Sequence, residues 1–345
     1  MWAQYKIPQL KALQQVRRFD DSRSNRFYYY INSDGNIVIS AGITSVLGLV
    51  STERKAIDEW KKKHDDWERL LRSAAEYGTC LHEVYADIML DKGVDKQKLE
   101  HLRQVSTDNG SSYDMASKDI LSFLKFKEDV ALEPLITEGS PEYNHGILTW
   151  VDEDGNSLAM TIDLLAKIKT TSKEKVQVED GIYTRGANKG KFKYKTETKE
   201  VTTEKVVLID FKSNFFEKDK KTFYEAHKMQ LMAAQLAVEQ NFNLKVSELY
   251  NYAGVAWRTT PSYTLFKQEV SDNDWKTFYA YWNLAKVKRL NIPSGRILLT
   301  GEFKNSNDYK YYSYPEYVKE LLLTEEEKKQ VKDVVIDTEI EDGEE

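Results

Sequence analysis

The clearest hydrophobic pattern in the chain lies at residues 206–213, where an apolar run ends in two alternating charges. Residues 206–209 are Val-Val-Leu-Ile, and Asp210, Phe211 and Lys212 follow directly. A short run rich in Val and Ile predicts a strand that is buried on both faces. Because side chains alternate along a strand, Asp210 and Lys212 share one face and Phe211 points into the core. The two charges form either a surface ion pair or a metal ligand beside a catalytic cation.

A second carboxylate interrupts the apolar stretch at residues 157–168, which the pattern predicts to be one strand. Asp163 stands there between Ile162 and Leu164. A buried carboxylate without a partner is costly, so it needs a cation or hydrogen bonds. Two carboxylates on buried strands therefore indicate a metal site.

Strand and helix periods alternate along the rest of the chain, which predicts an α/β fold with a mixed central β-sheet flanked by helices. Tyr77-Gly78-Thr79 is expected to interrupt a helix, and His82 and Glu83 then lie in the first turn of the next one. The further predicted strands are 26–31, 36–40, 135–138, 146–151, 249–257 and 262–270, and the predicted helices are 8–18, 41–50, 80–89, 119–130, 222–240 and 271–290.

Residues 169–205 form a polar insertion between the two acidic strands, and the pattern predicts a basic β-hairpin there. Residues 185–199 carry six basic side chains against Glu197, and Gly186 and Gly190 mark the tip. Either the lysines keep an exposed hairpin edge from aggregating, or the hairpin binds nucleic acid. On the second interpretation the contact residues are Arg185, Lys189, Lys191, Lys193 and Lys195.

Composition narrows the class of protein. The 345 residues are 41% hydrophobic and 31% charged, which permits a sizeable core, and the net charge is −6. The single cysteine, Cys80, excludes a disulfide framework and a cysteine-bound zinc or iron–sulfur site. No apolar run has the length of a signal core or a membrane span, so a cytoplasmic location is expected. Residues 1–332 are expected to form one domain, followed by an acidic, disordered tail at 333–345.

The motifs, taken in order, resemble the PD-(D/E)XK nuclease superfamily in its RecB-like branch, which includes phage exonucleases. The resemblance covers roughly residues 27–270, with a restriction-endonuclease-like core at about 75–270. The chain departs from the family pattern at Met160, Ala234 and Ala86, and it lacks the four cysteines that hold an iron–sulfur cluster in some members. The motifs that carry the resemblance are Gly78-Thr79-x-x-His82-Glu83, Ile162-Asp163, Ile209-Asp210-Phe211-Lys212 and Gln230-Leu231.

This resemblance implies a Mg²⁺ or Mn²⁺ site without an iron–sulfur cluster. In the family the cation activates water and neutralises the reacting phosphate. The implied metal ligands are His82, Asp163, Asp210 and the Phe211 carbonyl. Lys212 is the implied catalytic cation, Gln230 positions it or the phosphate, and Glu83 and Glu138 are additional acidic candidates.

The resemblance also implies the activity. It implies a metal-dependent DNA nuclease, expected to be an exonuclease of recombination, repair or phage DNA metabolism, in a bacterial cell or a phage-infected host. The implied partners are single- or double-stranded DNA and a recombination or replication protein. Three alternatives stay open: a catalytically silent nuclease-fold protein that binds nucleic acid, a metal-dependent endonuclease, and an unrelated hydrolase of small phosphate esters.

Overall fold

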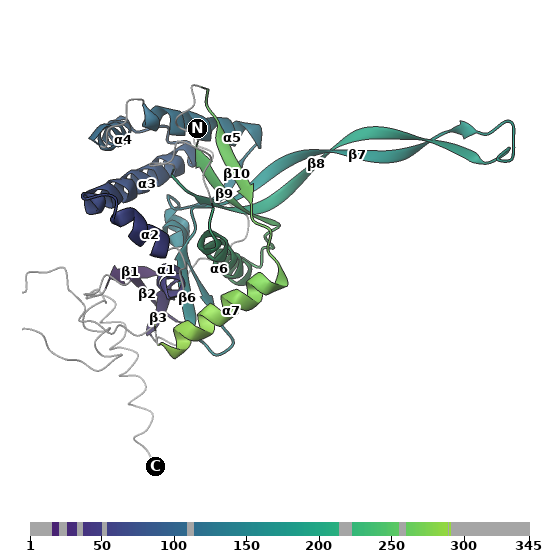
Figure 1. The fold of residues 1–345 in the computed structure, drawn as a ribbon. Helices are drawn as coiled ribbons and strands as arrows, with labels where there is room; N and C mark the ends of the chain where they lie inside the picture. Colours follow the sequence, from purple (N-terminus) through teal and green to yellow (C-terminus); the bar gives the residue numbers. More distant parts are fainter. Residues whose placement is uncertain are drawn as a thin grey trace, which may run out of the picture.

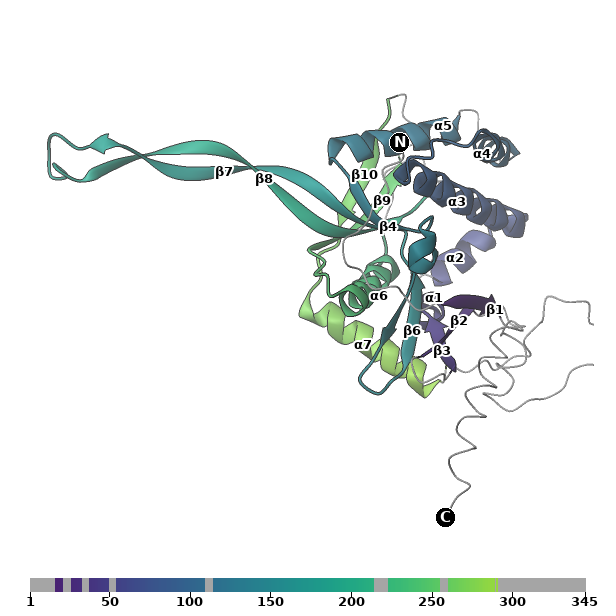
Figure 2. The same cartoon turned by 180° about the vertical axis from the view of Figure 1, so that it is seen from behind.

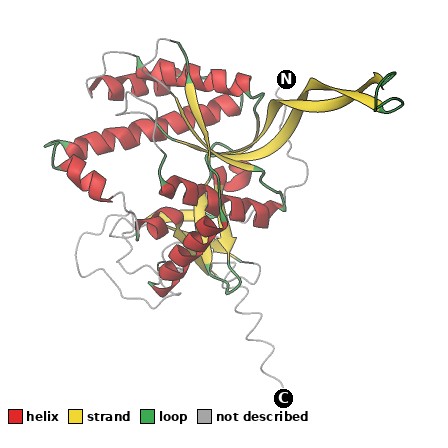
Figure 3. Cartoon of the chain, turned by 45° about the vertical axis from the view of Figure 1, so that its right-hand side comes forward, coloured by secondary structure: helices red, strands yellow, loops and turns green. Residues whose placement is uncertain are grey.

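The computed structural model describes residues 16–20, 26–32, 37–49, 54–108, 114–213, 223–254, 260–288 and 290. These residues form two five-stranded sheets with helices packed on them (Figures 1 and 3). The fold is a mixed α/β fold with a mixed central sheet flanked by helices, as predicted. The acidic segment 333–345 and most of the predicted helix 8–18 lie outside the described residues. Arg17 and Arg18, at the end of that predicted helix, belong to a strand instead.

The central sheet has the strand order β10-β9-β8-β7-β4. Strands β8 and β9 run parallel and the other neighbours run antiparallel, so the sheet is mixed. Its strands are β4 (Glu133–Thr137), β7 (Leu164–Ile182), β8 (Phe192–Phe211), β9 (Glu248–Gly254) and β10 (Tyr263–Lys267).

Both faces of this sheet are buried, which explains the continuous apolar run at 206–209. Ile209 and Phe211 belong to one core cluster, with α3 (Trp67–Met89) and α5 (Met115–Asp129). Leu208 belongs to the other cluster, under α6 (Glu225–Phe242). Phe211 is 2% exposed, so the predicted alternation of faces is confirmed.

The second sheet packs beside the first and shares the α6 core. Its strand order is β1-β2-β3-β6-β5, in which only the β3–β6 pair is parallel. Its elements and the remaining helices are β1 (Arg17–Asp20), β2 (Arg26–Ile31), β3 (Ile37–Gly42), β5 (Ile147–Val151), β6 (Ser157–Thr161), α1 (Ile43–Gly48), α2 (Arg54–Lys61), α4 (Lys96–Asp108), α7 (Asp272–Val287) and the 3₁₀ helix η1 (Pro141–Gly146).

Two predictions about element boundaries are wrong. Residues 157–168 are not one strand, because β6 ends at Thr161 in one sheet and β7 begins at Leu164 in the other. Asp163 therefore lies in the link between two sheets. Helix α3 also runs through Tyr77-Gly78-Thr79 without interruption. Its packing against α4 and α5 outweighs the cost of about 1 kcal/mol for an internal glycine.

The predicted insertion is a β-hairpin that projects from the body as a two-stranded ribbon (Figures 1 and 2). Strand β4 pairs with β7 only up to Lys167, and β9 pairs with β8 only from Val207. Between these limits β7 and β8 pair only with each other, from Lys169 opposite Glu204 to Ile182 opposite Phe192. We call residues 169–205 the arm.

Candidate metal centre

A row of side chains crosses the central sheet at the end of its α6 face. Asp210 is in register with Asn251 on β9, which is in register with Phe266 on β10. On the other side of β8, Leu164 pairs with Ile209, which places Asp163 beside Asp210. Thr137 pairs with Leu164, which places Glu138 beside Asp163. Strand pairing thus brings three carboxylates, distant in sequence, to one edge of the sheet.

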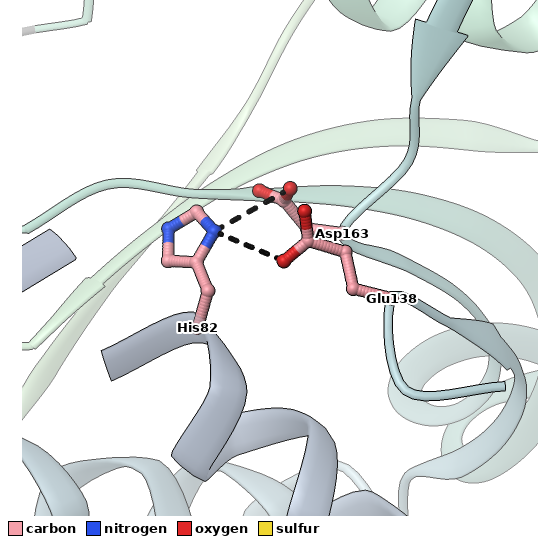
Figure 4. Close-up of side chains that lie close together, drawn as sticks. All are labelled: His82, Glu138 and Asp163. Carbon is pink, nitrogen blue, oxygen red and sulfur yellow. Dashed lines mark ion pairs between the residues drawn. The ribbon is translucent and has the colours of Figure 1, made fainter. Parts of the chain in front are cut away.

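His82 reaches this row from helix α3 (Figure 4). Its Nδ1 atom lies 3.6 Å from Glu138 Oε2 and 3.6 Å from Asp163 Oδ1. The imidazole edge packs on the Phe211 ring, with ring centroids 5.7 Å apart. One ligand atom each from His82, Glu138 and Asp163 lies within 4.8 Å of the other two. This is close enough for one cation to contact all three residues.

Asp163 is oriented by the backbone of β8. Its Oδ2 atom accepts a hydrogen bond of 2.6 Å from the Phe211 N–H, and its Oδ1 atom faces His82. The link between the two sheets therefore aims one carboxylate oxygen at the candidate site. This contact involves the Phe211 amide, so the implied role of its carbonyl as a metal ligand stays a prediction.

Asp210 lies beside this cluster in a separate hydrogen-bond network. Its Oδ1 atom accepts from Lys212 Nζ at 2.7 Å, and its Oδ2 atom accepts from Asn251 Nδ2 at 2.6 Å. Gln268 in turn donates to Asn251 Oδ1 at 2.6 Å. Lys212 Nζ also donates to Gln230 Oε1 on α6 at 3.3 Å, so two acceptors fix the ammonium. Each oxygen accepts one hydrogen bond and keeps a second lone pair, so Asp210 can also contact a cation.

His82 and Asp163 hold each other in ionised form. Burial opposes the imidazolium of His82, but Asp163 and Glu138 outweigh it and raise the His82 pKa to about 10. Burial favours protonated Asp163, but His82, Lys212 and the Phe211 N–H hold its pKa below the usual value. Burial raises the pKa of Asp210. The positive charge of Lys212 acts against this rise, and the negative charge of Asp163 adds to it. The carboxylates thus draw positive charge into the site, and a metal ion that bound His82 would displace its proton.

The structure separates Glu83 from its neighbour His82. Successive residues on a helix point about 100° apart, and Glu83 points into a groove between α3 and α4. Its carboxylate lies 3.3 Å from Lys98 Nζ and is 55% exposed. The sequence offered Glu83 and Glu138 as additional acidic candidates, and it is Glu138 that lies in the cluster with His82 and Asp163. The structure therefore gives no support to a catalytic Glu83.

Sequence reasoning also missed Asn251, which donates to Asp210, and Gln268, which donates to Asn251. Asn251 is fully buried within an otherwise apolar strand, Leu249-Tyr250-Asn251-Tyr252. A buried amide needs hydrogen-bond partners, so this position carries the same signal as Asp163.

The arm holds all five residues predicted to bind nucleic acid. Lys195 Nζ lies 2.9 Å from Glu197, and Lys193 Nζ lies 3.3 Å from Asp180. Lys191 donates to Asn188 Oδ1 at 3.4 Å. Exposed ion pairs of this kind are worth about 0–1 kcal/mol, so they yield readily to phosphate. Arg185 and Lys189 are also exposed, in the turn of the arm.

A comparison with models of known protein families gave no match, and neither did a comparison with curated protein sequences. Within the described part of the chain, every helix is too short or too polar to cross a membrane.

Proposed function

We propose that this protein is a divalent-metal-dependent nuclease that hydrolyses phosphodiester bonds in DNA, acting from DNA ends. The observation that carries the proposal is the meeting of His82, Glu138 and Asp163 at the sheet edge, with the Asp210–Lys212 pair beside them. These residues come from four separate segments, and only the fold unites them. Metal ligands beside a fixed ammonium match the needs of phosphodiester hydrolysis.

The donor set fits a hard divalent cation. Glu138 and Asp163 offer carboxylate oxygens, which suit Mg²⁺, and the imidazole of His82 makes Mn²⁺ favourable as well. A cation held there would supply an activated water and neutralise charge on the phosphate. Asp210 is the further ligand in this proposal, through the lone pairs that its hydrogen bonds to Lys212 and Asn251 leave open.

Lys212 stabilises negative charge on the reacting phosphate in this proposal. Asp210 and Gln230 hold its Nζ on the α6 side of the sheet edge, so its position is set before substrate binds. A preorganised ammonium spends little energy on reorientation during the reaction. Gln230 acts through Lys212 as a positioning residue.

The arm favours a polymeric substrate over a small phosphate ester. Residues 169–205 carry ten basic and six acidic side chains, a local charge of +4 on a chain whose net charge is −6. A positive ribbon that projects from the body has few contacts to make with a small molecule. Along a polyanion it can contact successive phosphates.

Binding without cleavage is a second candidate, and one observation favours it. Among the described residues, the ligand atoms of His82, Glu138 and Asp163 cluster without those of Asp210, whose oxygens accept hydrogen bonds from Lys212 and Asn251. A site with these three ligand residues would bind a cation only weakly. The protein would then bind DNA without cutting it.

The decisive experiment compares linear, end-labelled DNA with covalently closed circular DNA of the same sequence, each with Mg²⁺, Mn²⁺ or EDTA. We expect metal-dependent loss of the linear form while the circle survives. Cleavage of the circle at a comparable rate would identify an endonuclease. Retained binding of linear DNA without cleavage in either metal would favour the second candidate. Cleavage in EDTA would refute the metal centre.

A further inference from the structure

The tip of the arm carries large apolar side chains that are about half exposed. The exposed fractions are 53% for Ile182, 54% for Phe192 and 52% for Tyr194, and Tyr183 beside them is 41% exposed. Exposed edges of β-ribbons usually carry charge because apolar ones aggregate. These four residues therefore need a reason for their exposure.

Three of these side chains share one face of the ribbon. Ile182 lies opposite Phe192, and Tyr194 is two residues further along β8, opposite Glu179. Residues at even spacing on a strand point to the same side, so Ile182, Phe192 and Tyr194 form a continuous strip. We call these three residues the tip face.

Lysines continue this face toward the body of the protein. Lys175 lies opposite Thr198 and Lys173 opposite Glu200, in the same alternating set as Tyr194. Lys191, Lys193 and Lys195 alternate with Phe192 and Tyr194 along β8, so they lie on the opposite face. The register therefore places lysines on both faces of the ribbon, and on the tip face Glu179 lies opposite Tyr194, between the rings and Lys175.

We infer that the tip face stacks on unpaired bases of single-stranded DNA, while arm lysines contact the neighbouring phosphates. Aromatic rings flanked by positive charge are the usual means of holding a single strand without sequence preference. The arm's charge of +4 favours a polyanion over an apolar protein surface. This inference rests on the proposed function, since it takes DNA as the substrate of the metal centre.

The length of the arm sets how long a single strand must be to reach from the tip face to the metal centre. Ile182 at the tip lies 182 − 163 = 19 residues along the chain from Asp163, which at about 3.3 Å per residue gives roughly 60 Å. A single strand is more extended than the 3.4 Å per nucleotide of duplex, so fewer than about 18 nucleotides cover this distance. A strand seated on the tip face can therefore continue to the metal centre.

The test measures binding of a labelled 30-nucleotide single strand by fluorescence anisotropy, in EDTA so that no metal-dependent cleavage occurs. The double variant Phe192→Ser/Tyr194→Ser should lose roughly 10- to 100-fold in affinity. Its slope of log affinity against log salt should not change, because no charge is removed. Phe192→Trp/Tyr194→Trp should retain affinity and show added tryptophan quenching when the strand binds.

Leu121→Ser/Leu124→Ser on α5 is the matched control, because it removes exposed apolar surface elsewhere on the body. The inference is overturned if this control loses as much affinity as the tip-face variant, or if the tip-face variant binds like wild type. An equal loss on blunt duplex would also overturn it, since paired bases offer no free face inside the duplex. The inference would also be overturned if the tip-face variant changed its oligomeric state in light scattering while its DNA affinity stayed the same.

Cleavage assays separate this inference from the proposed function. The tip-face variant should raise KM for the single strand and leave kcat, and hydrolysis of the small substrate thymidine 5′-p-nitrophenyl phosphate, unchanged. If wild type binds the strand through the tip face but never cleaves it, the nuclease proposal fails and the binding surface stands. If wild type cleaves and the variant has an unchanged KM, the binding surface fails alone.

Discussion

A buried carboxyl between α3 and α5 is expected to lower the stability of the protein as its charge develops. Asp119 on α5 is 1% exposed. Its Oδ2 atom accepts a hydrogen bond of 2.8 Å from the Tyr77 hydroxyl on α3, and its Oδ1 atom has no hydrogen-bond partner among the described residues. Tyr77 lies five residues before His82 on the same helix, so this contact also anchors the helix that carries the candidate metal ligand.

The size of the effect follows from the pKa shift. Burial raises the pKa of Asp119 from 3.8 to about 7, although the Tyr77 hydrogen bond acts in the opposite direction. The folded protein therefore holds a proton that the unfolded chain has lost, and folding stability falls as pH rises from about 4 to about 7. At about 1.4 kcal/mol per pKa unit, roughly 4 kcal/mol is lost in total, of which about 2–3 kcal/mol falls between pH 5 and 8.

Urea unfolding of wild type and the Asp119→Asn variant at pH 5 to 8 measures this. An amide keeps an oxygen for Tyr77 and carries no charge. The free energy of unfolding of the variant should rise relative to wild type by about 2–3 kcal/mol from pH 5 to pH 8. Asp129→Asn, on the exposed surface of the same helix, is the control. Lys125 holds the pKa of Asp129 low, so its contribution stays constant above pH 5.

A difference between wild type and Asp119→Asn that is flat from pH 5 to 8 would refute the reasoning. It would mean that the ionised carboxylate is satisfied in solution. The nearby buried hydroxyls of Tyr85 and Tyr252 are the groups able to do this.

Three further predictions concern the site and the arm. Lys212→Ala should abolish cleavage and leave the fold and DNA affinity nearly intact, because the ammonium acts mainly on the transition state; cleavage at the wild-type rate would remove its assigned role. Calorimetric titration should show weaker Mn²⁺ binding for each of Asp163→Asn, His82→Ala and Glu138→Gln, but unchanged binding for Glu83→Gln. Equal effects of the two glutamate substitutions would contradict the placement of Glu83 on the other side of α3. Replacing four arm lysines by serine should lower the slope of log DNA affinity against log salt by up to about 3–4, and an unchanged slope would leave them as guards of the hairpin edge. These lysines are Lys189, Lys191, Lys193 and Lys195.

Sequence patterning identified the elements that supply the site. The run at 206–209 is a buried strand, and Asp210 and Lys212 lie on one face, 2.7 Å apart. The insertion is a hairpin, as the two glycines at its tip indicated. Each of these features depends on the period of side chains within one element, and that period is written in a few adjacent residues.

Only the tertiary structure decided which elements meet. The choice of Glu138 over Glu83 depends on the side of α3 that packs on Phe211, and the break at Asp163 depends on a change from one sheet to the other. The order β9-β8-β7-β4 aligns Asn251, Asp210, Asp163 and Glu138, which are up to 113 residues apart in the chain. Such pairings are selected by the burial of both sheet faces and the closure of long loops, for which no short stretch of sequence carries a signal.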